Sequence, residues 1–491
     1  MISGVCAFPR SWSSVVLVLG CLLGTKAVAQ NSNNPSYAED FRLLRYALET
    51  AHPSLYRFHT PAEFEDAFDS LGALITPDTK GDQFFRYASF IMSMVEEGHS
   101  DVGISEKLEF WAIGQPLFPF QVWVGEDQML ATSTEYSGYD AYVGQEIVTI
   151  NGRTIRQINH ALTQATSGRS GSKNLQGQLS MLSLADNFAQ SYFLFLDTAR
   201  SFEVQFRDPA TGALLTDSVS GITRANPHSY PYLPEPKKPP VTSEFNLEEG
   251  TAYLRIDSFA WWVINYSRRK YARDFRDFFR RVEQEQIAHV IIDVRNNRGG
   301  EELIWTDLVG YLTNEPFKIY NSLKTRTTDL SLVEDLPQVQ LPNYWEPELY
   351  EATDSGYFKQ EDEILGTFAP QKKYRFTGNV YVLGNGRSWS AASSFLGFMK
   401  TNQLGTLIGQ ESGGALGYVD GRKRLTFTLP RSQSIVSFPL WSMQLPYTSG
   451  DPDRGVLPDL EVTPTFDDLL SGRDVELETV HELIRQMPKA E

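Results

Sequence analysis

The feature that most constrains this fold is an alternation of apolar and amphipathic segments in the second half of the chain. Strands are predicted over residues 252–256, 290–294, 380–383 and 404–408, and helices over 266–284, 303–312 and 390–400. The run 290–294 is almost wholly apolar, as expected for a strand buried on both faces. Strand–helix–strand units build a mostly parallel sheet with its sites at the carboxyl ends of the strands. The sequence therefore predicts an α/β fold.

The first half of the chain divides into two regions of different texture. Apolar residues recur at helical spacing through residues 30–110, which predicts an N-terminal helical domain. Residues 111–225 have mainly the pattern of strands and turns, with a type I′ hairpin signal at Asn151-Gly152. A proline-rich linker over 226–243 then leads into the α/β domain, residues 244–491.

Residues 1–29 have the layout of a secretory signal peptide. They carry Arg10, no acidic residue, the apolar run 15–23 and a small-residue cleavage site that ends at Ala29. Nine apolar residues are too few to cross a bilayer, which takes about 20. We expect a bacterial protein exported to the periplasm or the cell exterior, with cleavage after Ala29. The alternative is lipoprotein processing, which would leave a lipid anchor on Cys21.

Charge and motif content narrow the class of partner. Lys and Arg number 44 against 61 Asp and Glu, a net charge of −17. A surface this acidic repels phosphate groups, so we expect no nucleic-acid partner, and anionic membranes are poor partners. Both cysteines, Cys6 and Cys21, lie within the predicted leader, so the mature chain is expected to hold no disulfide and no cysteine nucleophile. The sequence contains no H-E-x-x-H, P-loop or dinucleotide fingerprint, so we expect no metal and no organic cofactor.

Two strand-to-helix turns carry candidate catalytic groups. The strand at 290–294 leads into Gly299-Gly300, where backbone N–H groups can approach a substrate closely because no Cβ intervenes. The strand at 380–383 leads to Ser388 and Ser390 at the start of a helix, where free N–H groups favour a developing anion. The structural alternative is that either serine is only an N-cap, which the local pattern by itself favours.

A nucleophilic serine needs a base, and the chain offers seven histidines. Five are interpreted as structural or linker residues: His52, His59, His160, His228 and His289. His99 is a candidate because Gly98 is expected to end a helix in the left-handed conformation and leave His99 on exposed backbone. His481 is the other candidate, since Ser390, Asp451 or Asp459, and His481 follow the chain order of an α/β-hydrolase. The serine turn lacks the second glycine of G-x-S-x-G, however, and His481 falls in a predicted helix.

Four segments in order carry a family resemblance: Glu97-Gly98-His99-Ser100, residues 292–300, residues 388–393 and residues 455–459. Together they resemble the tail-specific, or C-terminal processing, protease family S41. The segment His52-Pro53-x-Leu55-Tyr56 is similar to a variant common among exported bacterial members. The likeness extends from His52 to Asp459.

The resemblance implies a core like that of ClpP and crotonases, an N-terminal helical cap, and a PDZ-like element within the β-rich region. It also implies a peptide or protein substrate. By family position Ser390 would be the nucleophile, and the oxyanion hole would be formed at Gly300 and Ala391, with Gly299 beside them.

One departure from the family concerns the base. Processing proteases of this family usually carry a lysine in the loop that here covers residues 411–417, where Ala415 stands in its place; Lys423 comes eight residues later. The tricorn-like branch instead uses an N-terminal histidine, and His99 fits that position. The group that orients His99 stays open among Glu97, Ser100, Asp101, Glu411 and Asp451. The resulting prediction is an exported serine endopeptidase; the alternative is a catalytically inactive relative that binds extended peptides by strand addition.

Overall fold

A computed structural model describes residues 35–134, 138–166, 173–223, 239–262, 266–354, 356–446 and 450–487. The predicted signal peptide and the proline-rich stretch 226–238 lie outside the described residues. No helix in the described ranges combines the length and the apolar character that crossing a bilayer requires.

The α/β prediction is confirmed by a sheet built from the second half of the chain. In spatial order its six described strands are β18 (Leu460–Glu461), β15 (Thr406–Gly409), β14 (Asn379–Gly384), β10 (His289–Asp293), β9 (Thr251–Ile256) and β8 (Val241–Asn246). Neighbours from β18 to β9 run parallel, and only the β8–β9 pair is antiparallel. Asp293 at the end of β10 lies beside Leu383 on β14, so these two strands deliver the chain to the same edge.

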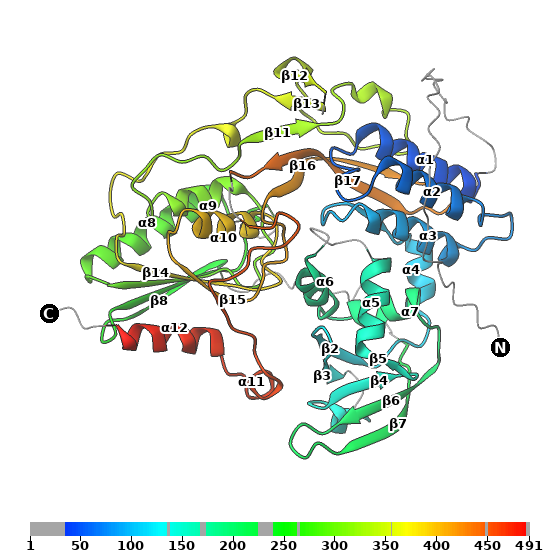
Figure 1. The fold of residues 1–491 in the computed structure, drawn as a ribbon, viewed down its shortest axis with the longest axis horizontal. Coiled ribbons are helices and arrows are strands. Elements are labelled where there is room, and N and C mark those ends of the chain that lie inside the picture. The colour runs from blue at the N-terminus through cyan, green and yellow to red at the C-terminus, as the bar shows by residue number, and fades with distance from the viewer. Residues whose placement is uncertain are drawn as a thin grey trace.

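Helices cover both faces of this sheet. Helices α8 (Arg268–Gln284), α9 (Glu302–Val309) and α10 (Ala391–Thr401) share one apolar core with the sheet, and α12 (Val475–Gln486) packs on the opposite face (Figure 1). The buried stripe of α8 shows why it packs there: Tyr271, Phe275, Phe278, Phe279 and Val282 recur at helical spacing. Each such side chain contributes about 1.5–3 kcal/mol when it leaves water.

The N-terminal helices share a core with the second half of the chain. They are α1 (Tyr37–Ala51), α2 (Pro61–Gly72) and α3 (Gly81–Met94), followed by β1 (Asp101–Gly103) and α4 (Glu106–Ile113). Strand β1 pairs antiparallel with β17 (Ile435–Gln444). The same sheet contains β16 (Tyr418–Thr428), β11 (Ser322–Thr325), β13 (Gly356–Lys359) and β12 (Tyr350–Thr353). The β1–β17 pairing therefore fixes the segment that precedes β1 against the α/β part of the molecule.

The region predicted as β-rich combines a sheet with three helices. Its strands are β2 (Phe120–Val124), β3 (Met129–Thr134), β4 (Glu146–Ile150), β5 (Arg153–Thr154), β6 (Ser201–Arg207) and β7 (Leu214–Ser220). The predicted Asn151-Gly152 turn joins β4 to β5, with φ of 49° and 74°. Helix α5 (Ile155–Ala165) contains His160, which the sequence already places on a helical face, and begins with the Thr154–Gln157 capping box. Helices α6 (Leu175–Leu182) and α7 (Asn187–Phe195) were not predicted. The short helix α11 (Phe466–Ser471) precedes α12.

Candidate active site

The two predicted turns meet at the shared edge of β10 and β14. A Cβ atom added to Gly299 would lie 2.8 Å from the Ser390 Cβ and 2.9 Å from the Ala391 nitrogen. One added to Gly300 would lie 2.1 Å from the Phe259 carbonyl carbon. Both glycines also have positive φ, 91° and 140°. The glycine pair is therefore required for the loop to lie directly against the Ser390 turn.

Ser390 is not an ordinary helix cap. It occupies the N-cap position of α10 with φ 52° and ψ −123°, and its side chain makes no capping hydrogen bond. Its Oγ instead lies 3.1 Å from the Nε2 atom of His99, 291 residues earlier in the chain. A non-glycine residue held at positive φ is strained, and such strain concentrates at functional sites.

Ser388 has the structural role in this turn. It is fully buried; its Oγ donates to the Val294 carbonyl at 2.8 Å and accepts the Asn385 N–H at 3.1 Å. These bonds join the end of β14 to the end of β10. The turn thus contains one serine that holds it together and one that faces a base.

Glu97 orients His99. Its Oε1 accepts from His99 Nδ1 at 2.8 Å, and its Oε2 accepts the His99 backbone N–H at 2.9 Å. Because a carboxylate only accepts, Nδ1 carries the proton and Nε2 is free to accept from Ser390. The prediction that Gly98 has a left-handed conformation is wrong: α3 ends at Met94, and the positive φ, 51°, belongs to Glu96.

The environment tunes the basicity of His99. Burial lowers the pKa of His99, but the charge and hydrogen bond of Glu97 raise it by more than burial lowers it. The pKa of His99 therefore lies above its ordinary value. The carboxylate favours the imidazolium that forms when His99 accepts a proton. The His99 side chain is still 26% exposed, so it remains open to a substrate.

Behind Glu97 the hydrogen bonds continue to a buried histidine. Ser100 Oγ donates to Glu97 Oε2 at 2.9 Å, so the predicted orienting residue Ser100 acts on Glu97 and not directly on His99. His52 Nδ1 accepts the Ser54 N–H at 3.3 Å, which leaves Nε2 to donate to Ser100 Oγ at 2.9 Å. Burial lowers the pKa of His52 to about 4, so this ring is neutral. We call the chain from His52 through Ser100, Glu97 and His99 to Ser390 the histidine relay.

The predictions that Glu411 or Asp451 orients His99 are wrong. Glu411 pairs with Arg454 at 2.6 Å and also accepts the Gly455 N–H, while Asp451 pairs with Lys173 at 2.7 Å. Each carboxylate neutralises a cation of its own, and the imidazole of His99 makes its hydrogen bonds with Glu97 and Ser390 instead. Asp101 is the first residue of β1 and is exposed, whereas its neighbour Val102 is buried.

The alternative bases are engaged elsewhere. Ala415 stands where the family lysine was expected. It is buried, forms a β-bridge with Gly455 and offers no basic side chain. The Lys423 ammonium lies over the Trp441 ring, 5.5 Å from its centroid. His481, on α12, pairs with Glu249 at 3.0 Å. The α/β-hydrolase interpretation is therefore wrong.

The candidate oxyanion donors differ in availability. The Gly299 N–H donates to Asn297 Oδ1 at 2.9 Å, so this amide is committed to the loop, and its assignment as an oxyanion donor is wrong. Ala391 is the first residue of α10, where an N–H has no acceptor within the helix. The assignment of Gly300 and Ala391 as oxyanion donors stays a prediction.

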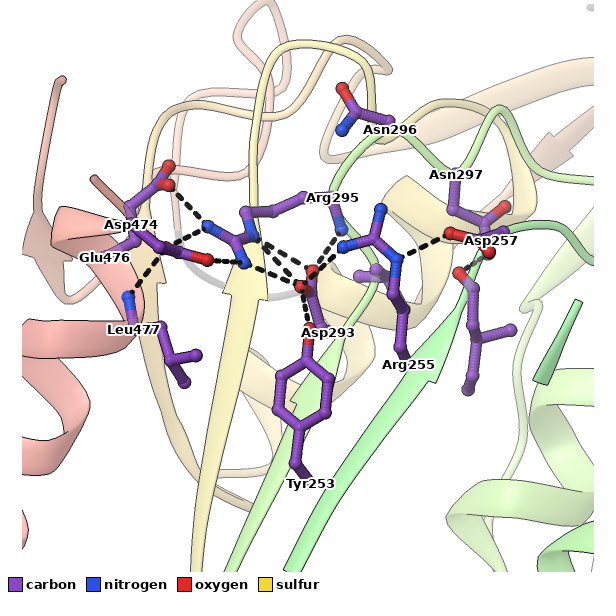
Figure 2. A network of polar contacts seen from close by, with 12 residues as sticks. Tyr253, Arg255, Asp257, Asp293, Arg295, Asn296, Asn297, Asp474, Glu476 and Leu477 are labelled. Atoms are coloured by element: carbon purple, nitrogen blue, oxygen red, sulfur yellow. Dashed lines mark hydrogen bonds and ion pairs between the residues drawn. The ribbon is translucent and has the colours of Figure 1, made fainter. Parts of the chain in front are cut away.

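A second polar network joins the carboxyl ends of β9 and β10 to the start of α12 (Figure 2). Arg295 donates to Asp293 at 2.7 Å, to Asp474 at 2.6 Å and to Glu476 at 2.6 Å. Tyr253 and Arg255 also donate to the fully buried Asp293. We call these residues the arginine cluster: Tyr253, Arg255, Asp293, Arg295, Asp474 and Glu476. Burial lowers the pKa of Arg295, but its carboxylate partners raise it more, so the cluster joins β10 permanently to the start of α12.

A cavity of about 400 Å³ opens beside Ser390 and His99. Helices α3, α6 and α7 supply most of its walls, so the unpredicted helices shape the space next to the nucleophile. In the part of the chain that the structure describes, no group of three or more His, Cys, Asp and Glu side chains is arranged to hold a metal ion.

Comparisons with known proteins agree with this geometry. Residues 250–462 match the model of Peptidase family S41. The structure of mature CPAF complexed with lactacystin is similar to this chain, with a TM-score of 0.65, 14% identity, and coverage of 92% of this chain and 98% of that one. Mature CPAF by itself gives 0.62 and 14%, with coverage of 92% and 97%. At this identity the likeness shows a shared fold. No curated protein matches the sequence.

Proposed function

Residues 250–462 belong to peptidase family S41, the chain is a serine-type peptidase, and from this premise we propose an exported endopeptidase with Ser390 as nucleophile and His99 as base. The observation that carries the proposal is the continuous line of hydrogen bonds from Ser390 through His99 to Glu97, at 3.1 and 2.8 Å. It supplies a nucleophile, a base and an orienting carboxylate without the family lysine.

The chemistry is acyl transfer in two steps. Ser390 Oγ attacks the peptide carbonyl as its proton passes to His99 Nε2, and the N–H groups of Gly300 and Ala391 stabilise the oxyanion. His99 then gives this proton to the departing amine, which breaks the C–N bond and leaves an acyl-enzyme. Water, deprotonated by the same imidazole, releases the second product and restores Ser390.

The second candidate function is a catalytically inactive protein that binds extended peptides. Its support in the sequence is the missing lysine in the loop 411–417. The strained backbone of Ser390 weighs against it, because an unused serine at this position would have no reason to adopt φ 52°.

A fluorophosphonate probe separates the two functions, because only an activated serine is labelled. We expect labelling and peptide hydrolysis by the wild-type chain. Ser390→Ala should abolish both, with a loss of roughly 10⁴- to 10⁶-fold in kcat and an unchanged Tm. The matched variant Ser388→Ala should lower the Tm but keep labelling. A wild-type chain that takes no label would refute the peptidase function and leave the binding function as the alternative. An inactive Ser388→Ala beside an active Ser390→Ala would reverse the assignment of the serines.

Export is the second part of the proposal, and it rests on the layout of residues 1–29. Expression in a Gram-negative bacterium, fractionation and N-terminal sequencing test it. We expect the mature chain outside the cytoplasm with Gln30 as its first residue. A lipid-modified Cys21 at the new N-terminus would show the anchored form, and an intact Met1 in the cytoplasm would refute export.

A further inference from the structure

Helix α8 carries a concentration of positive charge on an acidic protein. The chain has a net charge of −17, yet the 17 residues of α8 contain seven arginines and lysines against three acidic residues. Four of its arginines recur at the spacing i, i+4, i+7 and i+11: Arg269, Arg273, Arg276 and Arg280. Residues at this spacing share one face of a helix. We call these four residues the α8 stripe.

The α8 stripe faces solvent. All four of its residues are exposed, whereas the apolar residues of α8, which begin with Tyr271, are buried on another face. At 1.5 Å per residue the stripe is about 16 Å long. The helix lies at the outer edge of the α/β part of the molecule (Figure 1). Within the described ranges Arg269 has no ion pair.

The neighbouring aspartates do not neutralise the stripe. Arg273 pairs with Asp274 at 2.9 Å. Arg276 and Arg280 share Asp277, at 3.0 and 3.5 Å. The side chains of these three arginines are 45–54% exposed, and ion pairs at such exposure contribute little in water. The stripe therefore keeps an excess of positive charge, and its guanidinium groups are available to an external anion.

Two exposed tryptophans adjoin the first turn of α8. Trp261 and Trp262 are 42% and 55% exposed, and their rings pack edge to face with centroids 5.9 Å apart. The Trp261 carbonyl accepts the Tyr266 N–H at 3.1 Å, and the Lys270 ammonium lies 5.2 Å from the centre of the Tyr266 ring. Tryptophan is enriched where an apolar phase meets water, because its ring is apolar and its N–H is polar. The pair adds an apolar element to the end of the positive stripe.

We propose that the α8 stripe and the tryptophan pair form a docking surface for an anionic phospholipid bilayer. The forked guanidinium groups bind the phosphate oxygens of the headgroups, and the tryptophans enter the boundary between headgroups and acyl chains. The apolar face of α8 stays in the protein core, so the contact is peripheral. The inference goes beyond the peptidase proposal and does not depend on it.

The net charge of the chain does not prevent this contact. By itself a charge of −17 predicts poor binding to an anionic membrane. At physiological ionic strength, however, the Debye length is about 8 Å, so acidic groups on the remote parts of the protein are screened from the bilayer. Each Lys or Arg near an anionic surface strengthens binding about fivefold.

The shape of the surface favours a bilayer over nucleic acid. Proteins that combine arginines with aromatic side chains to bind a single strand hold it in a positive groove. The α8 stripe instead lies on the convex outer face of a helix, which a flat surface can contact along its length. The proposed export also brings the chain to membranes.

Sedimentation with sucrose-loaded vesicles tests the inference. We expect the purified chain to bind vesicles of phosphatidylcholine and phosphatidylglycerol in equal amounts, and not vesicles of phosphatidylcholine alone. Binding should be lost in about 1 M salt, where the Debye length falls to about 3 Å. Wild type and variants share residues 1–29, so a difference between them does not come from the predicted signal peptide.

Variants locate the binding on α8. Replacing all four arginines of the α8 stripe by glutamine should lower the partition coefficient on the order of 500-fold, with an unchanged Tm because all four are exposed. Replacing them by lysine should keep binding within about tenfold of wild type, since the charge is retained. A matched control with wild-type binding replaces four exposed cations of other segments by glutamine: Lys107, Arg156, Lys318 and Lys372.

The tryptophan pair has a readout of its own. Brominated phosphatidylcholine in the anionic vesicles quenches tryptophans that reach the acyl chains. We expect partial quenching of the wild type, lost in the double variant Trp261→Leu, Trp262→Leu. The matched control is Trp111→Leu, which removes a tryptophan of α4 that is also 42% exposed, and it should leave the quenching unchanged.

Several outcomes would overturn the inference. One is a wild-type chain that does not bind the anionic vesicles at low salt, and another is an equal loss of binding in the stripe variant and its charge-matched control. Tighter binding to a single-stranded oligonucleotide than to vesicles would assign the surface to nucleic acid. Self-association that only the stripe variant abolishes, without vesicle binding, would assign it to a second copy of the chain.

Discussion

The histidine relay and the arginine cluster both border the loops that hold Ser390 and Gly299, but they are built from different groups. The relay runs through hydroxyls, imidazoles and the Glu97 carboxylate, and its base, His99, has a side chain that is 26% exposed. In the cluster, Asp293 is fully buried and Arg295 is only 9% exposed. One network ends at the surface where a substrate arrives, and the other ends inside the protein.

This difference shows that the function of a buried polar network depends on whether its groups can gain or lose a proton. A histidine titrates near neutral pH and can pass a proton on, whereas a guanidinium keeps its charge at every physiological pH. The relay can therefore perform acid–base chemistry, and the cluster can only hold β10 against α12. Breaking the relay should cost activity, while breaking the cluster should cost stability.

The largest effect should follow removal of the relay's base. His99→Ala leaves Ser390 protonated, and we expect kcat/KM to fall roughly 10⁴-fold or more with an unchanged Tm. Lys423→Ala and His481→Ala are the matched controls, and both should stay near wild-type activity. An inactive Lys423→Ala beside an active His99→Ala would restore a lysine base, and an inactive His481→Ala would restore the α/β-hydrolase order.

Glu97→Gln should weaken the relay without breaking it. We expect a loss of roughly 10²- to 10⁴-fold in kcat/KM, because the imidazolium loses its carboxylate. In the wild type, kcat/KM should rise with pH as His99 loses its proton, with an inflection above the ordinary histidine value of about 6.5, since Glu97 raises the pKa of His99.

The pH profile of Glu97→Gln then gives a signed test. Without the carboxylate the pKa of His99 falls, so the inflection should move to lower pH. The milder variant Ser100→Ala removes only one of the donors to Glu97 and should cost about tenfold, the value of a single hydrogen bond. An inflection that stays in place in Glu97→Gln would mean that another group sets the pH dependence.

Arg295→Met should break the arginine cluster. It leaves the buried Asp293 with only Tyr253 and Arg255 as side-chain partners, and we expect a loss of about 3 kcal/mol, the lower end of the range for a broken buried pair. Urea unfolding at neutral pH measures it. The folded fraction should take the fluorophosphonate label at the wild-type rate, with an unmoved pH inflection. A shifted inflection would show that the two networks are coupled.

Asp474→Asn should have the smallest effect. The Asp474 side chain is 41% exposed, so we expect a cost below about 1 kcal/mol. Burial raises the pKa of Asp474, but the hydrogen bond and charge of Arg295 lower it by more than burial raises it. The pKa of Asp474 therefore lies below its ordinary value. Its stabilisation is therefore present above about pH 4 and lost as the pH falls further. Unfolding free energies of variant and wild type should converge in acid; a constant difference would contradict this assignment.

The parts of the fold that the sequence predicted are those with a local pattern. The strand at 290–294 and the terminal helix Val475–Gln486 follow from periodicity alone, because each buries a continuous run or stripe. Helices α6 and α7 were missed. Each is short, and their apolar residues become a consistent face only against α3 and the sheet they pack on.

The candidate site divides in the same way. Its glycine loop and serine turn could be predicted, since the carboxyl ends of neighbouring parallel strands must meet at one edge of the sheet. His52 could not, because its motif carries no sign that its ring would lie within reach of Ser100. The five-residue motif His52-Pro53-x-Leu55-Tyr56 marks the position of His52 but does not indicate its role.

By itself, the sequence determined the α/β class, the turn that presents Ser390 and the absence of a lysine beside it. Only the tertiary structure decided which group orients His99. The sequence does not distinguish the five candidate orienting residues. The structure does, because a carboxylate that already neutralises a cation, as Glu411 does for Arg454, is not available to His99. His99 reaches Ser390 across 291 residues because β1 pairs with β17, a contact between distant strands whose register is set by packing and leaves no local pattern in the chain.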